Sequence, residues 1–146
     1  MHKIAIGCDP NAASTKQQLV SFLVEKGYEV CDFGSDDPIY ANVAINLAGA
    51  VVRGEYDRGI LICGTGIGMS LSANKVKGAY AAVLADGYSA QRARMSNNAN
   101  IACFGAFTAG QKLIETLAEI FLTSEFEPGS SSQPKVDRLR EYEQGH

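Results

Sequence analysis

A cysteine followed by three closely spaced glycines is the part of this sequence best suited to chemistry. The run Cys63-Gly64-Thr65-Gly66-Ile67-Gly68 comes directly after an apolar segment. Three glycines within five residues permit tight turns and let a ligand approach the backbone closely. If a helix starts in this loop, its first N–H groups have no partner within the helix and favour an anion. The run therefore predicts an anion-binding loop, although an ordinary strand-to-helix turn has the same pattern.

Cys63 is a candidate base or nucleophile, because the thiolate of a cysteine can take either role. The more common role of a free cysteine is that of a small buried apolar side chain. We expect that role for Cys31 and Cys103, which lie inside apolar segments, whereas Cys8 is compatible with both. Cys63 differs from these because it stands at the carboxyl end of a predicted strand.

Other catalytic and cofactor motifs are incomplete or missing in the sequence. The glycine loop lacks the full dinucleotide fingerprint and the Lys-Ser/Thr end of a P-loop, which leaves a nucleotide-binding domain as a weaker alternative. The two histidines, His2 and His146, are at the chain ends and give little support to a Ser-His-Asp or Cys-His mechanism. No cysteine pair has CxxC spacing. We expect neither a metal nor a cofactor.

The segments around the loop alternate between strand and helix patterns. Predicted strands cover 3–9, 28–33, 58–63, 79–84 and 101–104, and predicted helices cover 14–26, 41–53, 68–74, 88–96 and 109–122. This alternation predicts an α/β fold: a single Rossmann-like, doubly wound domain with a five-stranded parallel sheet and helices on both faces. Ligands of such sheets bind beyond the carboxyl ends of the strands, near the point where the strand order reverses.

The C-terminal segment has a different composition, so we assign 1–126 to the domain and 127–146 to a linker and helical tail. Residues 127–134 are rich in Ser, Pro and Gly, and 135–143 form a charged helix pattern. Its apolar anchors are only Val136, Leu139 and Tyr142. We expect this tail to pack on another surface, that of a partner subunit.

Bulk properties exclude several classes of protein. The chain has 146 residues, a net charge of -3 and a pI near 5.3, which argues against nucleic-acid binding. No apolar run approaches the roughly 20 residues that span a bilayer, so no membrane partner is expected. Without a signal-peptide pattern and with unpaired cysteines, the sequence predicts a cytoplasmic protein.

Several motifs together resemble the ribose-5-phosphate isomerase B family, which also includes galactose-6-phosphate isomerase subunits. The resemblance covers nearly the whole chain. Its motifs are Ile4-Ala5-Ile6-Gly7-Cys8-Asp9, Ile62 to Gly68, Ala73-Asn74-Lys75, Tyr88-Ser89-Ala90-Gln91 and Phe104-Gly105. It implies a metal-free isomerase that binds a small phosphorylated sugar and works through a cis-enediolate, commonly as a homodimer, with a tetramer also open, in which the neighbour completes each active site.

The resemblance also implies roles for individual residues. Cys63 would be the base that moves a proton between C1 and C2, and Thr65 would position the substrate or relay a proton. The enediolate oxygen would lie on the amides of Gly64, Gly66, Ile67 and Gly68, which agrees with the general ability of preorganised N–H donors to stabilise an oxyanion. Substrate hydroxyls would be contacted by Asp9, Tyr40 and Asn97.

Some family positions carry different residues here. Pro10 and Ser96 replace two histidines, and the second of these is the residue that opens the sugar ring in the family. Phosphate-binding arginines are replaced by Phe107, Ser130, Ser131 and Lys135. Arg94, Lys135 and Arg138 are therefore the candidate phosphate ligands, with Arg140 as a further one, although a solvated helix face would equally account for the cations of the tail.

The missing ring-opening histidine favours a substrate that cannot form a furanose. In a tetrose 4-phosphate the C4 oxygen carries the phosphate, so that ring cannot close. Tyr40-Ala41-Asn42, the run Tyr88 to Ala93 and Ser96-Asn97-Asn98-Ala99 resemble the D-erythrulose-4-phosphate isomerase branch. The favoured pair is therefore D-erythrulose 4-phosphate and D-erythrose 4-phosphate. Ribose 5-phosphate, a hexose 6-phosphate and a non-catalytic sugar-phosphate-binding homologue remain alternatives.

Overall fold

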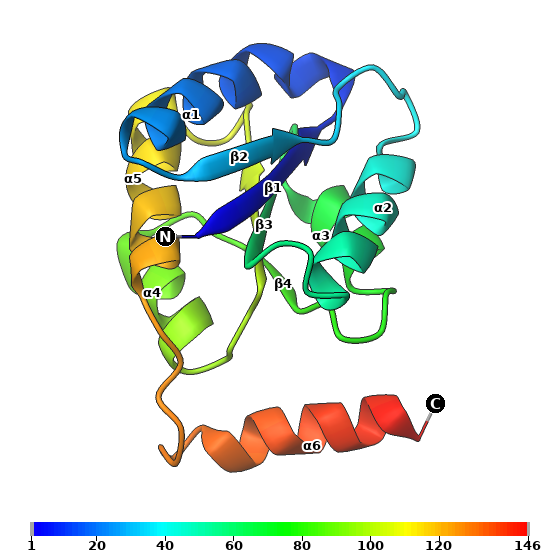
Figure 1. The fold of residues 1–146 in the computed structure, drawn as a ribbon, viewed down its shortest axis with the longest axis vertical. Helices are drawn as coiled ribbons and strands as arrows, with labels where there is room; N and C mark the ends of the chain where they lie inside the picture. The colour runs from blue at the N-terminus through cyan, green and yellow to red at the C-terminus, as the bar shows by residue number, and fades with distance from the viewer. Residues whose placement is uncertain (1, 146) are drawn as a thin grey trace.

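Five parallel strands form the centre of the structure, a computed structural model that describes residues 2–145 (Figure 1). Their order across the sheet is β2-β1-β3-β5-β4. The strands are β1 (Lys3–Cys8), β2 (Glu29–Asp32), β3 (Arg58–Cys63), β4 (Ala81–Val83) and β5 (Ile101–Gly105). The predicted five-stranded parallel sheet is thus confirmed.

Helices cover both faces of this sheet, as the sequence predicted (Figure 1). One apolar core lies under α1 (Ala13–Glu25), α4 (Gly87–Met95) and α5 (Gln111–Thr123), and a second lies under α2 (Tyr40–Val52) and α3 (Ile67–Ala73). Neighbouring residues of β1 alternate between them: Ile4 and Ile6 join the first core and Ala5 joins the second. This alternation is the two-residue period of a strand that is buried on both sides. Of the described helices, none has the length and apolarity needed to cross a membrane.

The strand order reverses between β1 and β3. From β1 the chain crosses to β2 on one side, and β3 then pairs with β1 on the other side. The ends of β1 and β3 are therefore adjacent at the point where connections leave in opposite directions, which is where open α/β sheets bind ligands. Cys63 is the last residue of β3, and the Asp9 amide beyond β1 donates to the Ile62 carbonyl over 3.1 Å.

Cys31 departs from its expected burial. It lies in β2 and is exposed. The reason is its position on an edge strand, where side chains lack a neighbouring strand on one side.

The tail helix α6 (Gln133–Gln144) crosses the end of the molecule where the strands begin (Figure 1). Its Val136 is buried, but most of its other side chains are exposed. Near its end, the Glu143 carboxylate accepts hydrogen bonds from the Gly78 amide over 3.0 Å and from the Tyr80 hydroxyl over 2.7 Å. Burial and this hydrogen bond raise the pKa of Tyr80 to about 12, so the hydroxyl remains a donor at neutral pH.

Replacing Glu143 by alanine should loosen α6 from its own chain, because two hydrogen bonds to a carboxylate are lost. We expect the protection of α6 amides in hydrogen exchange to fall by about 3- to 10-fold, with the sheet amides unchanged. Glu141→Ala is the matched control, since the Glu141 carboxylate pairs within the helix, with Arg138. Equal protection in the Glu143 and Glu141 variants would contradict this account of how α6 is held.

Candidate functional site

Cys63 ends β3 with its side chain almost fully enclosed, at 4% exposure. Its Sγ accepts a hydrogen bond from the Gly66 amide over 3.1 Å, and its carbonyl accepts one from the Ala106 amide over 2.8 Å. The sulfur therefore has one fixed position at the carboxyl edge of the sheet, beside the loop that follows it.

The glycine loop turns sharply from β3 into α3. Gly66 has a φ of 81°, a left-handed conformation that suits glycine, and precedes the first residue of α3. A Cβ at this position would also stand 3.1 to 3.3 Å from the backbone of Phe104. The Thr65 side chain is exposed, and its Oγ1 accepts a hydrogen bond from the Ile67 amide over 3.3 Å. The amides of Gly66 and Ile67 thus have acceptors within the loop, namely the Cys63 sulfur and the Thr65 hydroxyl oxygen.

Two other predicted substrate contacts lie beside this loop. Tyr40, the first residue of α2, places its hydroxyl so close to Gly68 that a Cβ there would overlap it. Asp9 is 9% exposed, and its Oδ1 accepts a hydrogen bond from the Ala12 amide over 3.0 Å. A phenol, a carboxylate, a thiol and a hydroxyl are therefore gathered around one turn of the backbone.

Gly105 is a residue of this site that the sequence did not indicate beyond its place in a motif. It is the last residue of β5 and pairs with Cys63 across the sheet. A Cβ on Gly105 would lie 2.8 Å from the Thr65 backbone and would overlap the Thr108 hydroxyl. The absence of a side chain here lets β5 support the loop directly. A glycine directly after the fifth predicted strand, 101–104, is the sequence signal for this contact.

The other buried cysteines are poor bases. Burial raises the pKa of the Cys8 thiol to about 11. Burial also raises the pKa of Cys103, which is enclosed in the sheet, well above its usual range. Both side chains are therefore protonated at neutral pH, which agrees with the apolar role expected for Cys103. For Cys8, where both roles were open, the raised pKa favours the apolar role.

Three of the predicted ligands lie far from Cys63 in the same chain. Asn97 follows the C-terminal end of α4, just before β5 begins, and α4 runs back along the sheet from the carboxyl edge. Lys135 and Arg138 are exposed on α6, at the edge where the strands begin. One copy of the chain therefore brings together the loop, Asp9 and Tyr40. Lys135 and Arg138 lie at the opposite edge, and Asn97 lies in a hollow between α4 and β4.

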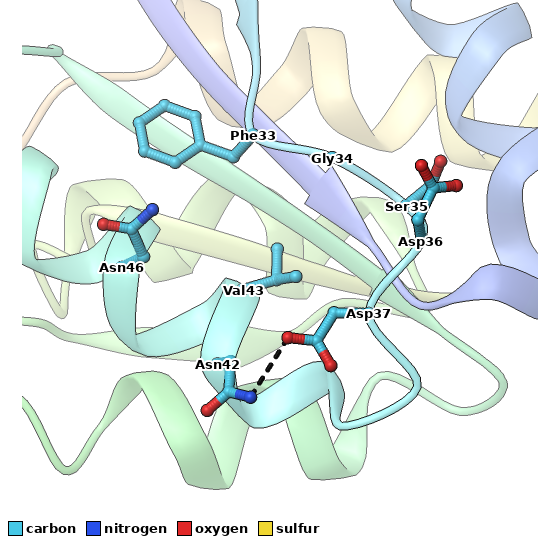
Figure 2. A pocket seen from close by; sticks show the side chains of 8 residues that line it. All are labelled: Phe33, Gly34, Ser35, Asp36, Asp37, Asn42, Val43 and Asn46. Carbon is cyan, nitrogen blue, oxygen red and sulfur yellow. Dashed lines mark hydrogen bonds between the residues drawn. The ribbon is translucent and has the colours of Figure 1, made fainter.

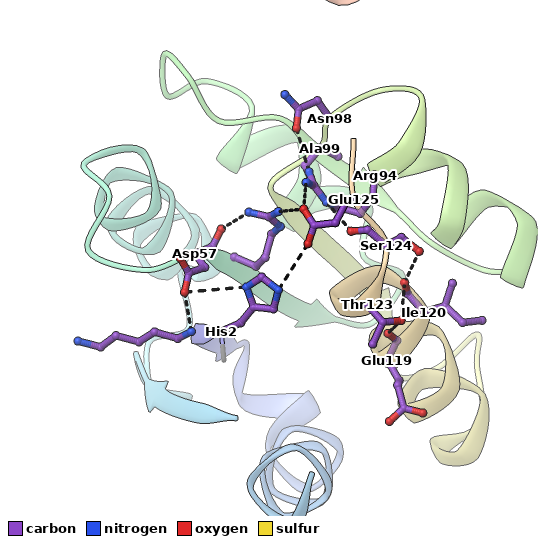
Figure 3. A network of polar contacts seen from close by, with 12 residues as sticks. His2, Asp57, Arg94, Asn98, Ala99, Glu119, Ile120, Thr123, Ser124 and Glu125 are labelled. Carbon is purple, nitrogen blue, oxygen red and sulfur yellow. Dashed lines mark hydrogen bonds and ion pairs between the residues drawn. The ribbon is translucent and has the colours of Figure 1, made fainter. Parts of the chain in front are cut away.

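Arg94 is enclosed in a polar network at that opposite edge, which Figure 3 shows. Its side chain is 3% exposed and donates to the carbonyls of Ala99 and Ser124 and to the Asn98 side chain, while Glu125 lies 3.8 Å away. Burial, with the nearby charge of Arg58, lowers the pKa of Arg94 to about 10. Arg94 remains charged at neutral pH, but it holds α4 to the chain that follows α5. This placement does not support the predicted phosphate role.

A hollow of about 300 Å³ lies beside the start of α2 (Figure 2). Asp36 and Asp37 contribute carboxylates to its lining, and Asn42 donates to Asp37 over 3.0 Å. Two carboxylates without a neighbouring cation repel a phosphate. We therefore do not assign this hollow to the phosphate of a substrate.

Phe107 stands next to the glycine loop in place of a cation. Its amide donates to the Gly64 carbonyl over 2.9 Å, its ring lies against Gly64, and its side chain is 73% exposed. The mouth of the site is apolar on this side. Residues 2–145 also contain no group of three or more His, Cys, Asp or Glu side chains arranged to hold a metal ion.

Comparison with known proteins identifies relatives over nearly the full chain. The sequence model of the family described as Ribose/Galactose Isomerase matches residues 4–139. A ribose-5-P isomerase B of Listeria innocua is 48% identical, with 97% of each chain covered, and a D-erythrulose-4-phosphate isomerase of Pectobacterium atrosepticum is 46% identical, covering 98% of this chain and 96% of the other. The solved structure of the Leishmania infantum type B ribose 5-phosphate isomerase is 36% identical and superposes with a TM-score of 0.92, covering 99% of this chain and 97% of the other.

Proposed function

The chain belongs to the ribose/galactose isomerase family of sugar-phosphate isomerases, and on this basis we propose that it interconverts D-erythrulose 4-phosphate and D-erythrose 4-phosphate. The observation that carries the chemistry is the position of Cys63, whose sulfur is held by the Gly66 amide inside the glycine loop. The feature that favours the substrate is Ser96, at a position where the family resemblance implies a ring-opening histidine.

The proton transfer can be followed atom by atom. The Cys63 thiolate takes a proton from C1 of the ketose, the C1–H electron pair forms the C1–C2 double bond, and the C2 carbonyl oxygen becomes an enediolate oxygen. Amides of the loop stabilise this negative charge, which is present in the intermediate but not in the substrate. Thr65 relays a proton from the C1 oxygen to the C2 oxygen. The thiol then returns a proton to C2, and the C1 carbonyl of the aldose forms.

A second copy of the chain completes each site in this proposal. Asp9, Tyr40 and the glycine loop come together in one chain, whereas Asn97 lines a separate hollow between α4 and the edge strand β4. In a symmetric dimer that seats Asn97 of one copy near Cys63 of the other, the same contact would complete both sites. The exposed face of α6, with Lys135 and Arg138, supplies further cations that a partner could use.

Ser96 supports a substrate that is already in its open-chain form. A serine hydroxyl is a poor acid at neutral pH, and this one accepts a hydrogen bond from Arg92 over 2.7 Å. Opening a furanose needs a group that protonates the ring oxygen, which an imidazolium does well. A tetrose 4-phosphate has no such ring to open, because its C4 oxygen is an ester oxygen.

A turnover assay with tetrose, pentose and hexose phosphates tests this assignment. We expect kcat/KM for D-erythrulose 4-phosphate to exceed that for ribose 5-phosphate by at least about 10-fold, the effect of an acid–base group missing from ring opening. Deuterium exchange from solvent into C1 and C2 should accompany turnover if an enediolate forms. Equal or better turnover of ribose 5-phosphate would exclude the proposed pair and favour ribose 5-phosphate isomerisation, the activity named for the Listeria innocua relative.

A further inference from the structure

Arg92 is a cation of α4 to which the sequence assigned no role. It lies in the last turn of α4 and lines a hollow of about 250 Å³ between this helix and the edge strand β4. Ser89 and Asn97 supply the other polar side chains of the lining. The hollow thus joins Arg92 to a residue already proposed to contact substrate.

The Arg92 guanidinium has no carboxylate partner within residues 2–145. Its Nε donates to the Ser96 hydroxyl over 2.7 Å, and its Nη1 lies 3.9 Å from the Met95 sulfur. No Asp or Glu oxygen of the described chain lies within 4.0 Å of it. A half-buried guanidinium that has lost part of its hydration and meets only neutral groups favours a bound anion.

Several other basic side chains of the described chain, by contrast, lie beside a carboxylate or are enclosed by acceptors. The buried Lys16 amine lies 2.8 Å from Asp32, and Arg138 pairs with Glu141 over 3.0 Å. Arg94, two residues after Arg92, is 3% exposed and donates to carbonyls and an amide. Arg92 combines partial burial, a fixed Nε and uncommitted charge, which is what a guanidinium needs to hold a phosphate with its two Nη groups.

We propose that Arg92 binds the phosphate of the substrate held by the Cys63 loop of a second copy, and that Ser96 is the positioning residue that orients Arg92. This inference rests on the function proposed above. The chemistry of the C4 oxygen supports it: this oxygen is the ring oxygen of a ribofuranose and the phosphate ester oxygen of a tetrose 4-phosphate. Ser96 stands where the family resemblance implies the acid that protonates this ring oxygen. In a tetrose 4-phosphate the same oxygen carries the phosphate, so the guanidinium held by Ser96 would meet the phosphate there.

Arg92→Gln tests the proposal, with Arg92→Lys to keep the charge and Arg53→Gln as the matched control. Arg53 is an exposed arginine paired with Glu55. The readouts are KM for the best sugar phosphate, competitive inhibition by inorganic phosphate, and deuterium exchange into unphosphorylated D-erythrulose. Arg92→Gln should raise KM and the inhibition constant of phosphate by about 10- to 100-fold, the effect of losing charged hydrogen bonds, while exchange into D-erythrulose stays at the wild-type rate.

The remaining variants separate a phosphate ligand from a structural residue. Arg92→Lys should regain part of the loss, and Ser96→Ala should raise KM by only about 2- to 5-fold, since the charge remains but is less well oriented. An inhibition constant of phosphate unchanged by Arg92→Gln would overturn the proposal, as would an equal loss for phosphorylated and unphosphorylated sugars. If Arg92→Gln does not fold, Arg92→Lys and Ser96→Ala take its place. For these variants too, the inhibition constant of phosphate must rise while exchange into D-erythrulose stays at the wild-type rate. Inhibition by phosphate is measured with whichever sugar phosphate the wild type prefers. A wrong substrate assignment would therefore appear in the turnover panel, and a wrong role for Arg92 would appear in the inhibition constant of phosphate.

Discussion

Replacing Cys63 by alanine should lower kcat by about 100- to 10,000-fold, the range that a well-placed general base contributes. Cys63 is the last residue of β3, and the position of its sulfur, the proposed base, is held by the Gly66 amide. Its removal leaves the loop amides and the Tyr40 hydroxyl in place. Binding of a sugar phosphate, measured by calorimetry, should therefore change by only a few fold.

Two further cysteine variants make this result specific. Cys63→Ser keeps the size of the side chain, but a hydroxyl is a much weaker source of a base than a thiol at neutral pH, so it should be nearly as inactive as Cys63→Ala. Cys31→Ser changes an exposed thiol on the edge strand β2 and should retain wild-type kcat. Turnover by Cys63→Ala within about 10-fold of wild type would assign the proton transfer to another group.

Replacing Gly105 by alanine should lower kcat by about 10- to 100-fold through the loop it supports, since small misplacements of reacting groups have effects of this size. The φ of Gly105 is not in the left-handed region, so backbone strain is not the cause. The cause is space: an added Cβ would lie 2.8 Å from the Thr65 backbone, and the loop would have to move away from β5. Turnover and thermal melting should both be measured.

Gly87→Ala is the matched control for this change. Gly87 begins α4, and a Cβ there would make an ordinary contact of 3.6 Å with Ile120. This variant should keep wild-type kcat and melting temperature. A Gly105→Ala enzyme with unchanged kcat would show that the loop can shift without cost to the chemistry, and the support from β5 would then be unimportant.

Much of the fold follows from short-range patterns in the sequence. Apolar runs such as Ile60-Leu61-Ile62 and helix periods separated by Gly predict strand and helix from neighbours a few residues apart, and these segments occur in the structure. Alternation of strand and helix then requires parallel pairing, because each helix returns the chain to the same edge of the sheet. The position of Cys63 at a carboxyl edge follows from the same reasoning.

Contacts between distant elements could not be predicted in this way. Arg94 and Arg92 are two residues apart on α4, yet one is enclosed by the chain after α5 and the other faces a hollow beside β4. Their environments depend on how α4 is rotated on the sheet, which local composition does not specify. The contact between Gly105 and Thr65 likewise depends on the pairing of β3 with β5.

The sequence by itself determined the doubly wound class of the fold, the catalytic candidate Cys63 and the family motifs around it, because each depends on residues adjacent in the chain. Only the tertiary structure decided that Asn97 lies between α4 and β4, that Arg94 has a structural setting, and that Ser96 holds Arg92. The physical reason is that packing sets the direction of each side chain. Contacts between residues far apart in the chain can be identified only once the packing of the helices on the sheet is known.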